Sequence, residues 1–145
     1  METKTKTTFK TYEADFPRVR EIFERAAGDA RDDKHVDPIW IEGFDRLVAI
    51  LDDVAALGEY CVARQTIVLA FNRFVELHDG IASYIAQTDG GRRVDMVLNI
   101  LIDAQHKYLN ELARTFGDFL GRPLNAIESG ALRAVMLGRA TQARI

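Results

Sequence analysis

Apolar residues recur at helical spacing along residues 60–87, and this segment carries the widest apolar surface in the chain. On a 3.6-residue period, its polar side chains fall in one narrow stripe. That stripe consists of Gln65, Asn72, Glu76, Asp79, Ser83 and Gln87. A helix that is apolar on about three sides must be covered on those sides. We therefore expect it to be the most buried helix, with Phe71 inside, enclosed by neighbouring helices or a second subunit.

Two amphipathic helices are predicted before this central segment. Asp15 followed by Pro17 is typical of a helix N-cap and first turn. Asp37 and Pro38 repeat the same start signal, and a single apolar stripe follows them. The pattern leaves open whether this second helix ends at Gly58 or continues into the central one, because one interior glycine costs only about 1 kcal/mol.

Two further helices are predicted after the central one. Residues 88–91, Thr-Asp-Gly-Gly, form the strongest helix-breaking run in the chain. A long amphipathic helix over residues 92–120 follows, and Gly121 is a suitable stop for it. The last helix opens at Asn125, and Glu128 three residues later completes the pattern of a capping box.

The sequence contains no alternating strand pattern and no internal repeat. It therefore predicts an all-α protein, an antiparallel bundle of four or five helices, in a single domain over residues 15–145. Residues 1–14 are polar and rich in threonine, and Lys4, Lys6 and Lys10 make them basic. We expect this segment to be a flexible N-terminal arm.

The last helix carries a strip of minimal side chains. Ala126, Gly130, Ala134 and Gly138 recur every four residues, so another helix can approach this strip closely. Apolar residues remain on both flanks of the strip. This excess of apolar surface predicts a homo-oligomer, most simply a dimer, and a possible protein partner at the C-terminal helix.

Composition narrows the classes of function. The chain has 145 residues and a formal net charge of −3, which disfavours nucleic acid as a partner. We expect no membrane partner, because no stretch resembles a membrane span and the N-terminus lacks the apolar core of a signal peptide. Cys61 is the only cysteine, so an intramolecular disulfide and a cysteine zinc site are excluded. These features indicate a cytoplasmic protein.

Asp103 and His106 are the first candidates for chemistry. They lie three residues apart on one face of the predicted helix, as the Glu-x-x-His pairs of di-iron four-helix bundles do. Those sites need a second pair and two more carboxylates, all pointing inward, whereas helical periodicity turns this pair outward. The sequence thus favours a surface pair without metal or cofactor, and a metal-binding four-helix bundle stays an alternative.

Arg73 and His78 are the second candidates, on the central helix. An arginine followed after four residues by a histidine resembles the Arg-x(4–6)-His signature of HEPN ribonucleases. That resemblance implies RNA cleavage by this pair at a dimer interface. The chain departs from the family at Phe74, where a polar residue usually follows the arginine. On the residues alone, His78 projects among apolar positions, so burial as a core histidine is the competing interpretation.

The sequence favours a non-catalytic function over either alternative. Most of the predicted helices have cleanly divided apolar and charged faces, and no acid, base and nucleophile can be placed in one cleft. We therefore interpret the chain as an accessory or scaffold protein that presents helical surface, without a cofactor.

Overall fold

The computed structural model describes residues 13–88 and 94–142, and within them all regular structure is helical. There are five helices in this part of the chain: α1 (Phe16–Asp32), α2 (Pro38–Ala56), α3 (Val62–Thr88), α4 (Val94–Leu120) and α5 (Ala126–Gln142). The predicted all-α fold, with four or five helices in a bundle, is therefore confirmed.

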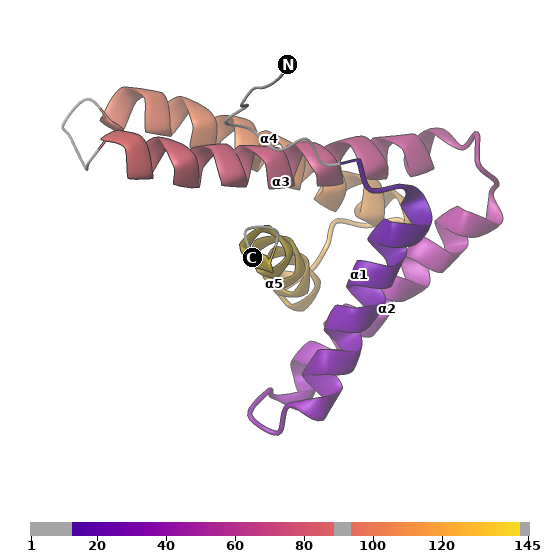
Figure 1. Cartoon of the computed structure of the whole chain (residues 1–145). Coiled ribbons are helices and arrows are strands. Elements are labelled where there is room, and N and C mark those ends of the chain that lie inside the picture. The colour runs from indigo at the N-terminus through magenta and orange to yellow at the C-terminus, as the bar shows by residue number, and fades with distance from the viewer. Residues whose placement is uncertain (1–12, 89–93, 143–145) are drawn as a thin grey trace, which may run out of the picture.

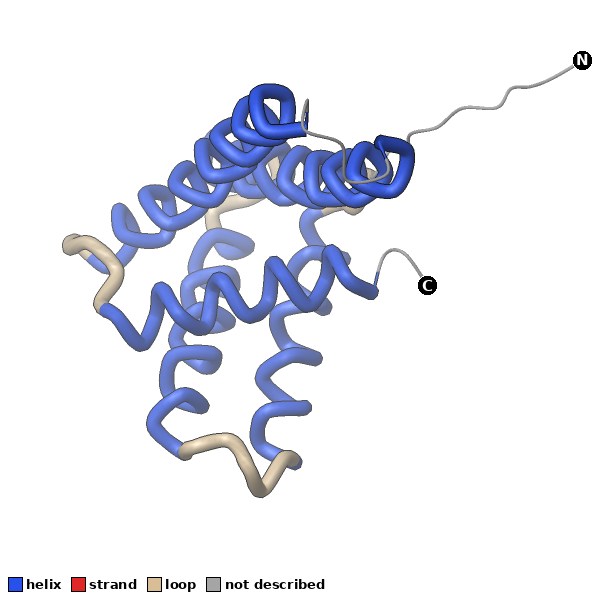
Figure 2. Tube along the Cα trace, turned by 90° about the vertical axis from the view of Figure 1, so that its left-hand side faces the viewer, coloured by secondary structure: helices blue, strands red, loops and turns tan. Residues whose placement is uncertain are grey.

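The helices are arranged as two antiparallel pairs with a fifth helix between them. Figure 1 shows the α1–α2 pair and the α3–α4 pair spreading apart from the connection between α2 and α3. α5 is seen end-on in the angle between the pairs, and Figure 2 shows it lying across the α1–α2 pair. It packs mainly on α2 and also contacts α1, α3 and α4.

Local signals set the ends of several helices as predicted. Asp15 caps α1, since its Oδ1 accepts a hydrogen bond from the backbone N–H of Arg18 at 3.0 Å. Asp37 caps α2 in the same way. Gly58 has a φ of 97°, a conformation that favours glycine, so α2 ends before it and α3 is a separate helix. This answers the question that the apolar pattern leaves open.

The core is built from the apolar faces of all five helices. Phe23 of α1 and Phe116 of α4 meet edge to face, with ring centroids 5.9 Å apart. Phe71 and Phe74 of α3 are buried with them. Other members include Leu47, Leu51, Val54, Ile67, Leu112, Leu132 and Met136.

α3 is buried along only part of its length. Ile67 and Phe71 lie in the core, but farther along the helix Ile81 is half-buried and Ile85 is exposed. Figure 1 shows the reason: the α3–α4 pair extends beyond α5, so the outer turns of α3 pack mainly on α4. Neighbouring helices of the same chain therefore enclose only the first part of α3.

Truncating Phe71 tests whether α3 anchors the core. Phe71→Ala removes a fully buried ring, so we expect the free energy of unfolding to fall by about 3–5 kcal/mol in chemical denaturation. Leu69→Ala is the matched control, because Leu69 is 52% exposed two residues away; its effect should stay within about 0.5 kcal/mol. Equal losses in the two variants would contradict this description of the core.

Candidate interaction surfaces

α5 begins at a buried carboxylate. Asn125 and Glu128 form the predicted capping box: the Asn125 Oδ1 accepts from the Glu128 N–H at 2.8 Å, and the Asn125 N–H donates to the Glu128 Oε1 at 2.9 Å. These bonds satisfy two backbone donors at the start of α5. They also hold the carboxylate of Glu128 at a fixed position beside the end of α4.

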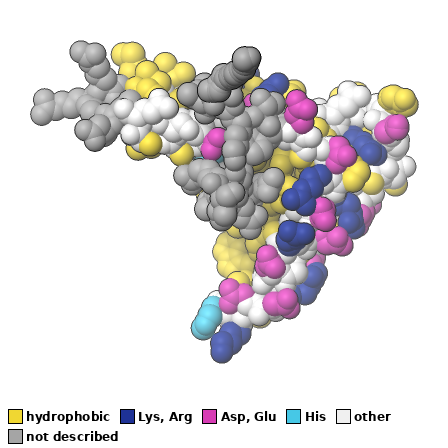
Figure 3. Space-filling model, in the orientation of Figure 1, with side chains coloured by type: hydrophobic (Ala, Val, Ile, Leu, Met, Phe, Trp, Pro, Cys, Tyr) yellow, Lys and Arg dark blue, Asp and Glu magenta, His cyan; other side chains and the backbone are white. Residues whose placement is uncertain are grey.

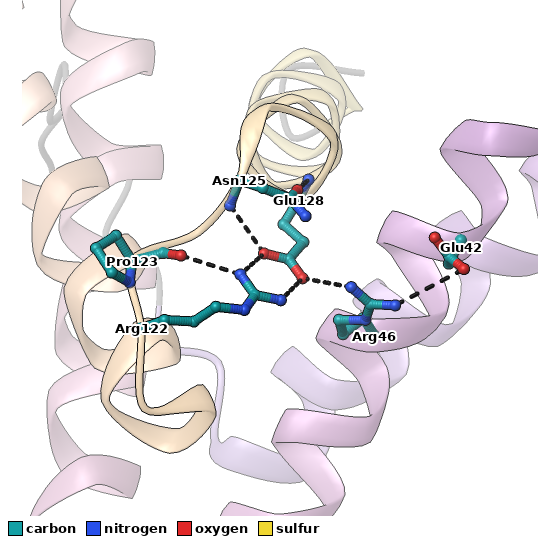
Figure 4. A network of polar contacts seen from close by, with 6 residues as sticks. All are labelled: Glu42, Arg46, Arg122, Pro123, Asn125 and Glu128. Carbon is teal, nitrogen blue, oxygen red and sulfur yellow. Dashed lines mark hydrogen bonds and ion pairs between the residues drawn. The ribbon is translucent and has the colours of Figure 1, made fainter.

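Two arginines from other parts of the chain complete this site (Figure 4). Arg122, between α4 and α5, donates from Nη1 to Oε1 of Glu128 at 2.8 Å and from Nη2 to Oε2 at 2.7 Å. Arg46 of α2 donates from Nη1 to Oε2 at 2.9 Å. Glu128 is only 1% exposed, so this network links α2, α5 and the end of α4 through a buried charge.

The network changes the acidity of Glu128. The hydrogen bond from Arg122 is the largest cause that lowers its pKa, and the Asn125 N–H and Arg46 add to it. Burial acts in the opposite direction, because it disfavours the charged form. The result is a pKa of about 2 instead of the ordinary 4.5. The sequence predicts only the cap, since the cap partners are local whereas Arg46 lies 82 residues away along the chain.

The small-residue strip of α5 is partly occupied within the chain. A Cβ atom added to Gly130 would lie 2.3 Å from Cζ3 of Trp40 on α2, so the indole ring fills the space where a partner backbone was expected. Ala126, Ala134 and Gly138 remain exposed. The strip is therefore a contact surface for α2 at Gly130 and open at its other three positions.

A second close approach joins the same two helices. A Cβ atom on Gly43 of α2 would lie 2.9 Å from the backbone oxygen of Ile127 on α5. Because this neighbour is backbone, it cannot move without displacing the helix. Glycine at this position thus sets the separation of α2 and α5.

The structure places Arg73 and His78 on α3 without bringing them together. Residues five apart on a helix are separated by roughly 140° around its axis, so the two side chains do not share a face. Arg73 is exposed and pairs with Glu76 at 2.8 Å. His78 is half-buried rather than enclosed as its apolar neighbours suggest, since it lies toward the outer turns of α3.

Asp103 and His106 both lie exposed on the outer face of α4, as the helical period predicts. They border an open surface depression together with Lys107, Asn110 and Arg114. In the described part of the chain, no three His, Cys, Asp or Glu residues are grouped so that they could hold a metal ion.

The outer end of the α3–α4 pair exposes apolar side chains. We call Ile85 of α3 and Met96, Val97 and Ile100 of α4 the hairpin patch; Met96 is 75% and Ile100 62% exposed. Figure 3 shows hydrophobic side chains gathered at this end of the pair. Ile85 is exposed because α3 reaches beyond α5, and Met96 and Ile100 are exposed because they lie on the outer stripe of α4 with Asp103 and Lys107.

A groove runs along the first half of α3. It has a volume of about 730 Å³ and lies between this helix and the chain segment that enters α1. Asn72 is buried there, and its Oδ1 and Nδ2 are both hydrogen-bonded to the backbone of Ala14. The polar stripe of α3 therefore meets other parts of the protein at Asn72 instead of water.

The chain matches no protein-family model, no curated protein and no solved structure with which it was compared. Of the helices in the described ranges, none contains a stretch long and apolar enough to cross a membrane. The surfaces that stand out in this part of the chain are the hairpin patch, the open positions of the α5 strip and the groove along α3.

Two glycine-to-alanine changes separate the close helix contact from the open strip. Gly43→Ala should lower the free energy of unfolding by about 1–3 kcal/mol, because its Cβ pushes against the backbone of Ile127. Gly138→Ala should raise it by about 0.5–1 kcal/mol, since no atom lies within 4 Å of the new Cβ and alanine favours a helix. Urea denaturation measures the free energy of unfolding of both variants. If both substitutions changed it in the same direction, Gly43 and Gly138 would not differ in the way described.

The Glu128 network predicts how stability depends on pH. The folded pKa of Glu128 lies below its ordinary value, so its contribution is complete above pH 4.5 and is lost as the pH falls toward about 2. The difference corresponds to roughly 3 kcal/mol. Glu128→Gln should therefore be less stable at neutral pH and show a flatter loss of stability in this acidic window.

Glu111→Gln is the control for that measurement. Glu111 also pairs with an arginine, Arg114, but on the surface and within one helix, where an ion pair contributes at most about 1 kcal/mol. Denaturation at a series of pH values compares the two variants with the unmodified protein. If Glu111→Gln flattened the acid loss as much as Glu128→Gln does, the buried network would not be its cause.

Proposed function

We propose that this protein is a non-catalytic accessory protein that acts as a homo-oligomer, a dimer, joined through the hairpin patch. The observation that carries the proposal is the exposure of Met96 and Ile100, which lie one turn apart on the same face of α4. Monomeric proteins rarely leave contiguous apolar surface of this kind in water, and such surface typically marks an interaction site.

A second copy suits the patch for geometric reasons. Two antiparallel helical pairs that pack patch against patch would form a four-helix arrangement, which buries the exposed side chains of the patch in both copies. A two-fold interface must be complementary to itself. The uncharged hairpin patch meets this condition, and Asp103 and Lys107 farther along α4 supply both signs of charge to its border.

The polar groups of the interior support a structural function. The buried polar side chains of the described residues are Asn72, Gln105, Thr115 and Glu128. Three of them are hydrogen-bonded to other parts of this chain: Asn72 to Ala14, Thr115 to the carbonyl of Glu111, and Glu128 to its arginines. Asn72 and Glu128 use their polar atoms to join separate segments, Thr115 is bonded within α4, and the buried Nε2 of Gln105 has no hydrogen-bond partner among the described residues.

The exposed part of the α5 strip is the surface that we assign to a different protein partner. Ala134 and Gly138 leave the helix backbone accessible, and Leu137 beside them is exposed. A partner helix can approach such a surface closely. The chain needs no oxidising compartment for its single cysteine, Cys61, and we infer that it acts in the cytoplasm.

Replacing the patch with charge tests the dimer. Light scattering should give about twice the chain mass of 16.3 kDa for the unmodified protein. The double variant Met96→Glu, Ile100→Glu should give 16.3 kDa with unchanged helical circular dichroism, because four carboxylates would face one another across the two-fold axis.

Val62→Glu is the matched control, since Val62 is as exposed as Met96 but lies at the opposite end of α3. This variant should remain dimeric. A particle of one chain mass for the unmodified protein at high concentration would refute the proposal. A dimer that survives the double substitution would place the interface elsewhere.

A further inference from the structure

Asn72 holds the chain entering α1 against α3 in an unusual way. Its Oδ1 accepts from the N–H of Ala14 at 3.0 Å, and its Nδ2 donates to the carbonyl of the same residue, also at 3.0 Å. The side-chain amide thus pairs with both the N–H and the carbonyl of one residue, as a residue of a neighbouring strand does in an antiparallel sheet. Nδ2 also donates to the carbonyl of Val68, which fixes the amide on its own helix.

The direction of the chain at this point follows from a second contact. The guanidinium of Arg64 lies over the ring of Phe16, 4.7 Å from its centroid. Arg64 precedes Asn72 by eight residues, so Phe16 contacts α3 nearer its N-terminal end than Ala14 does. From Phe16 back to Ala14, the chain therefore moves toward the C-terminal end of α3, where Glu76 and Asp79 follow Asn72.

The surface of α3 between Asn72 and Ser83 is polar and acidic. Asn72, Glu76, Asp79 and Ser83 continue the stripe at helical spacing, and the groove along α3 reaches to Glu76. The charge of Arg73 on this side is matched by Glu76 at 2.8 Å. Asp79 is half-buried and takes part in none of the ion pairs formed among the described residues.

The segment that precedes Ala14 has the complementary chemistry. Residues 1–13 contain three lysines between two glutamates, Glu2 and Glu13, so the middle of the segment is basic. Lys4, Lys6 and Lys10 are all even-numbered, so an extended chain would present them on one side. Four extended residues span roughly 13 Å, which equals about nine residues of helix rise, so Lys10 can reach the level of Asp79.

We propose that the polar stripe of α3 from Asn72 to Ser83 is a docking site for the lysine-bearing N-terminal segment, residues 1–12, of the same chain. Asn72 sets the register through Ala14, and Asp79 with Glu76 receives Lys10. The docked segment would cover the one polar face of α3, on a different part of the surface from the hairpin patch. This inference does not rest on the proposed dimer.

Limited proteolysis of the full chain tests the docking. Trypsin cuts after lysine, so the rate at which residues 1–10 are released, followed by intact mass, reports how often Lys10 leaves α3. The variant Glu76→Gln, Asp79→Asn should release them about tenfold faster, since two charge contacts are lost. Glu111→Gln, Asp118→Asn removes the same charge from α4 and should leave the rate unchanged. Equal rates in all three proteins would overturn the proposal.

A substitution in the N-terminal segment tests the docking without changing a residue of the helices. Lys10→Glu reverses the charge outside the helices, and chymotrypsin can then report on the segment by cutting after Phe9 or Tyr12. We expect this cleavage to be about tenfold faster than in the unmodified protein, and added salt to accelerate it only in the latter. No difference between the two proteins would also overturn the proposal.

Repeating the trypsin experiment in the background Met96→Glu, Ile100→Glu separates this inference from the dimer. Protection of Lys10 that persists there and does not change on dilution assigns the segment to its own chain. Protection that disappears on dilution would show instead that the stripe binds the segment of a second copy. That result would contradict docking of the segment on its own chain, whether or not light scattering shows a dimer through the hairpin patch.

Discussion

The carboxylate of Glu128 accepts four hydrogen bonds while it is almost completely removed from water. A buried charge without these partners would cost several kcal/mol, so the three parts of the chain that supply them must stay together. Arg46 brings α2, Arg122 brings the end of α4, and Asn125 brings the start of α5. The position of α5 in the angle between the two helix pairs follows from this requirement, and with it the length of α3 that α5 can cover.

Signals within a few residues were sufficient to predict most of the fold. Asp15, Asp37 and Asn125 act as caps where the sequence places them, and the helical period of apolar residues identifies Phe71 as core. Periodicity shows which face of a helix is apolar, but it does not show which element lies against that face. The partnerships of Glu128 with Arg46 and of Asn72 with Ala14 join residues 82 and 58 apart in sequence, and no local pattern encodes them.

Periodicity likewise does not show which apolar side chains remain exposed in the folded protein. α3 and α4 have 27 residues each, whereas α5 has 17. α5 crosses the α3–α4 pair instead of running along it, so it covers only the inner turns of these two helices (Figure 1). Ile85 is exposed because α5 does not reach it, whereas Met96 and Ile100 lie on the outer stripe of α4 together with Asp103 and Lys107. The small-residue strip was identified from its spacing, but the ring that fills it at Gly130 comes from α2.

That ring belongs to the only tryptophan in the chain. Trp40 is partly exposed, and its inner edge lies against the α5 backbone at Gly130. Its indole therefore has two different environments, protein on one side and water on the other. Any rearrangement that lifts α5 from α2 changes the polarity around the indole and hence its emission wavelength. The fluorescence of Trp40 therefore reports whether the contact between α2 and α5 is intact.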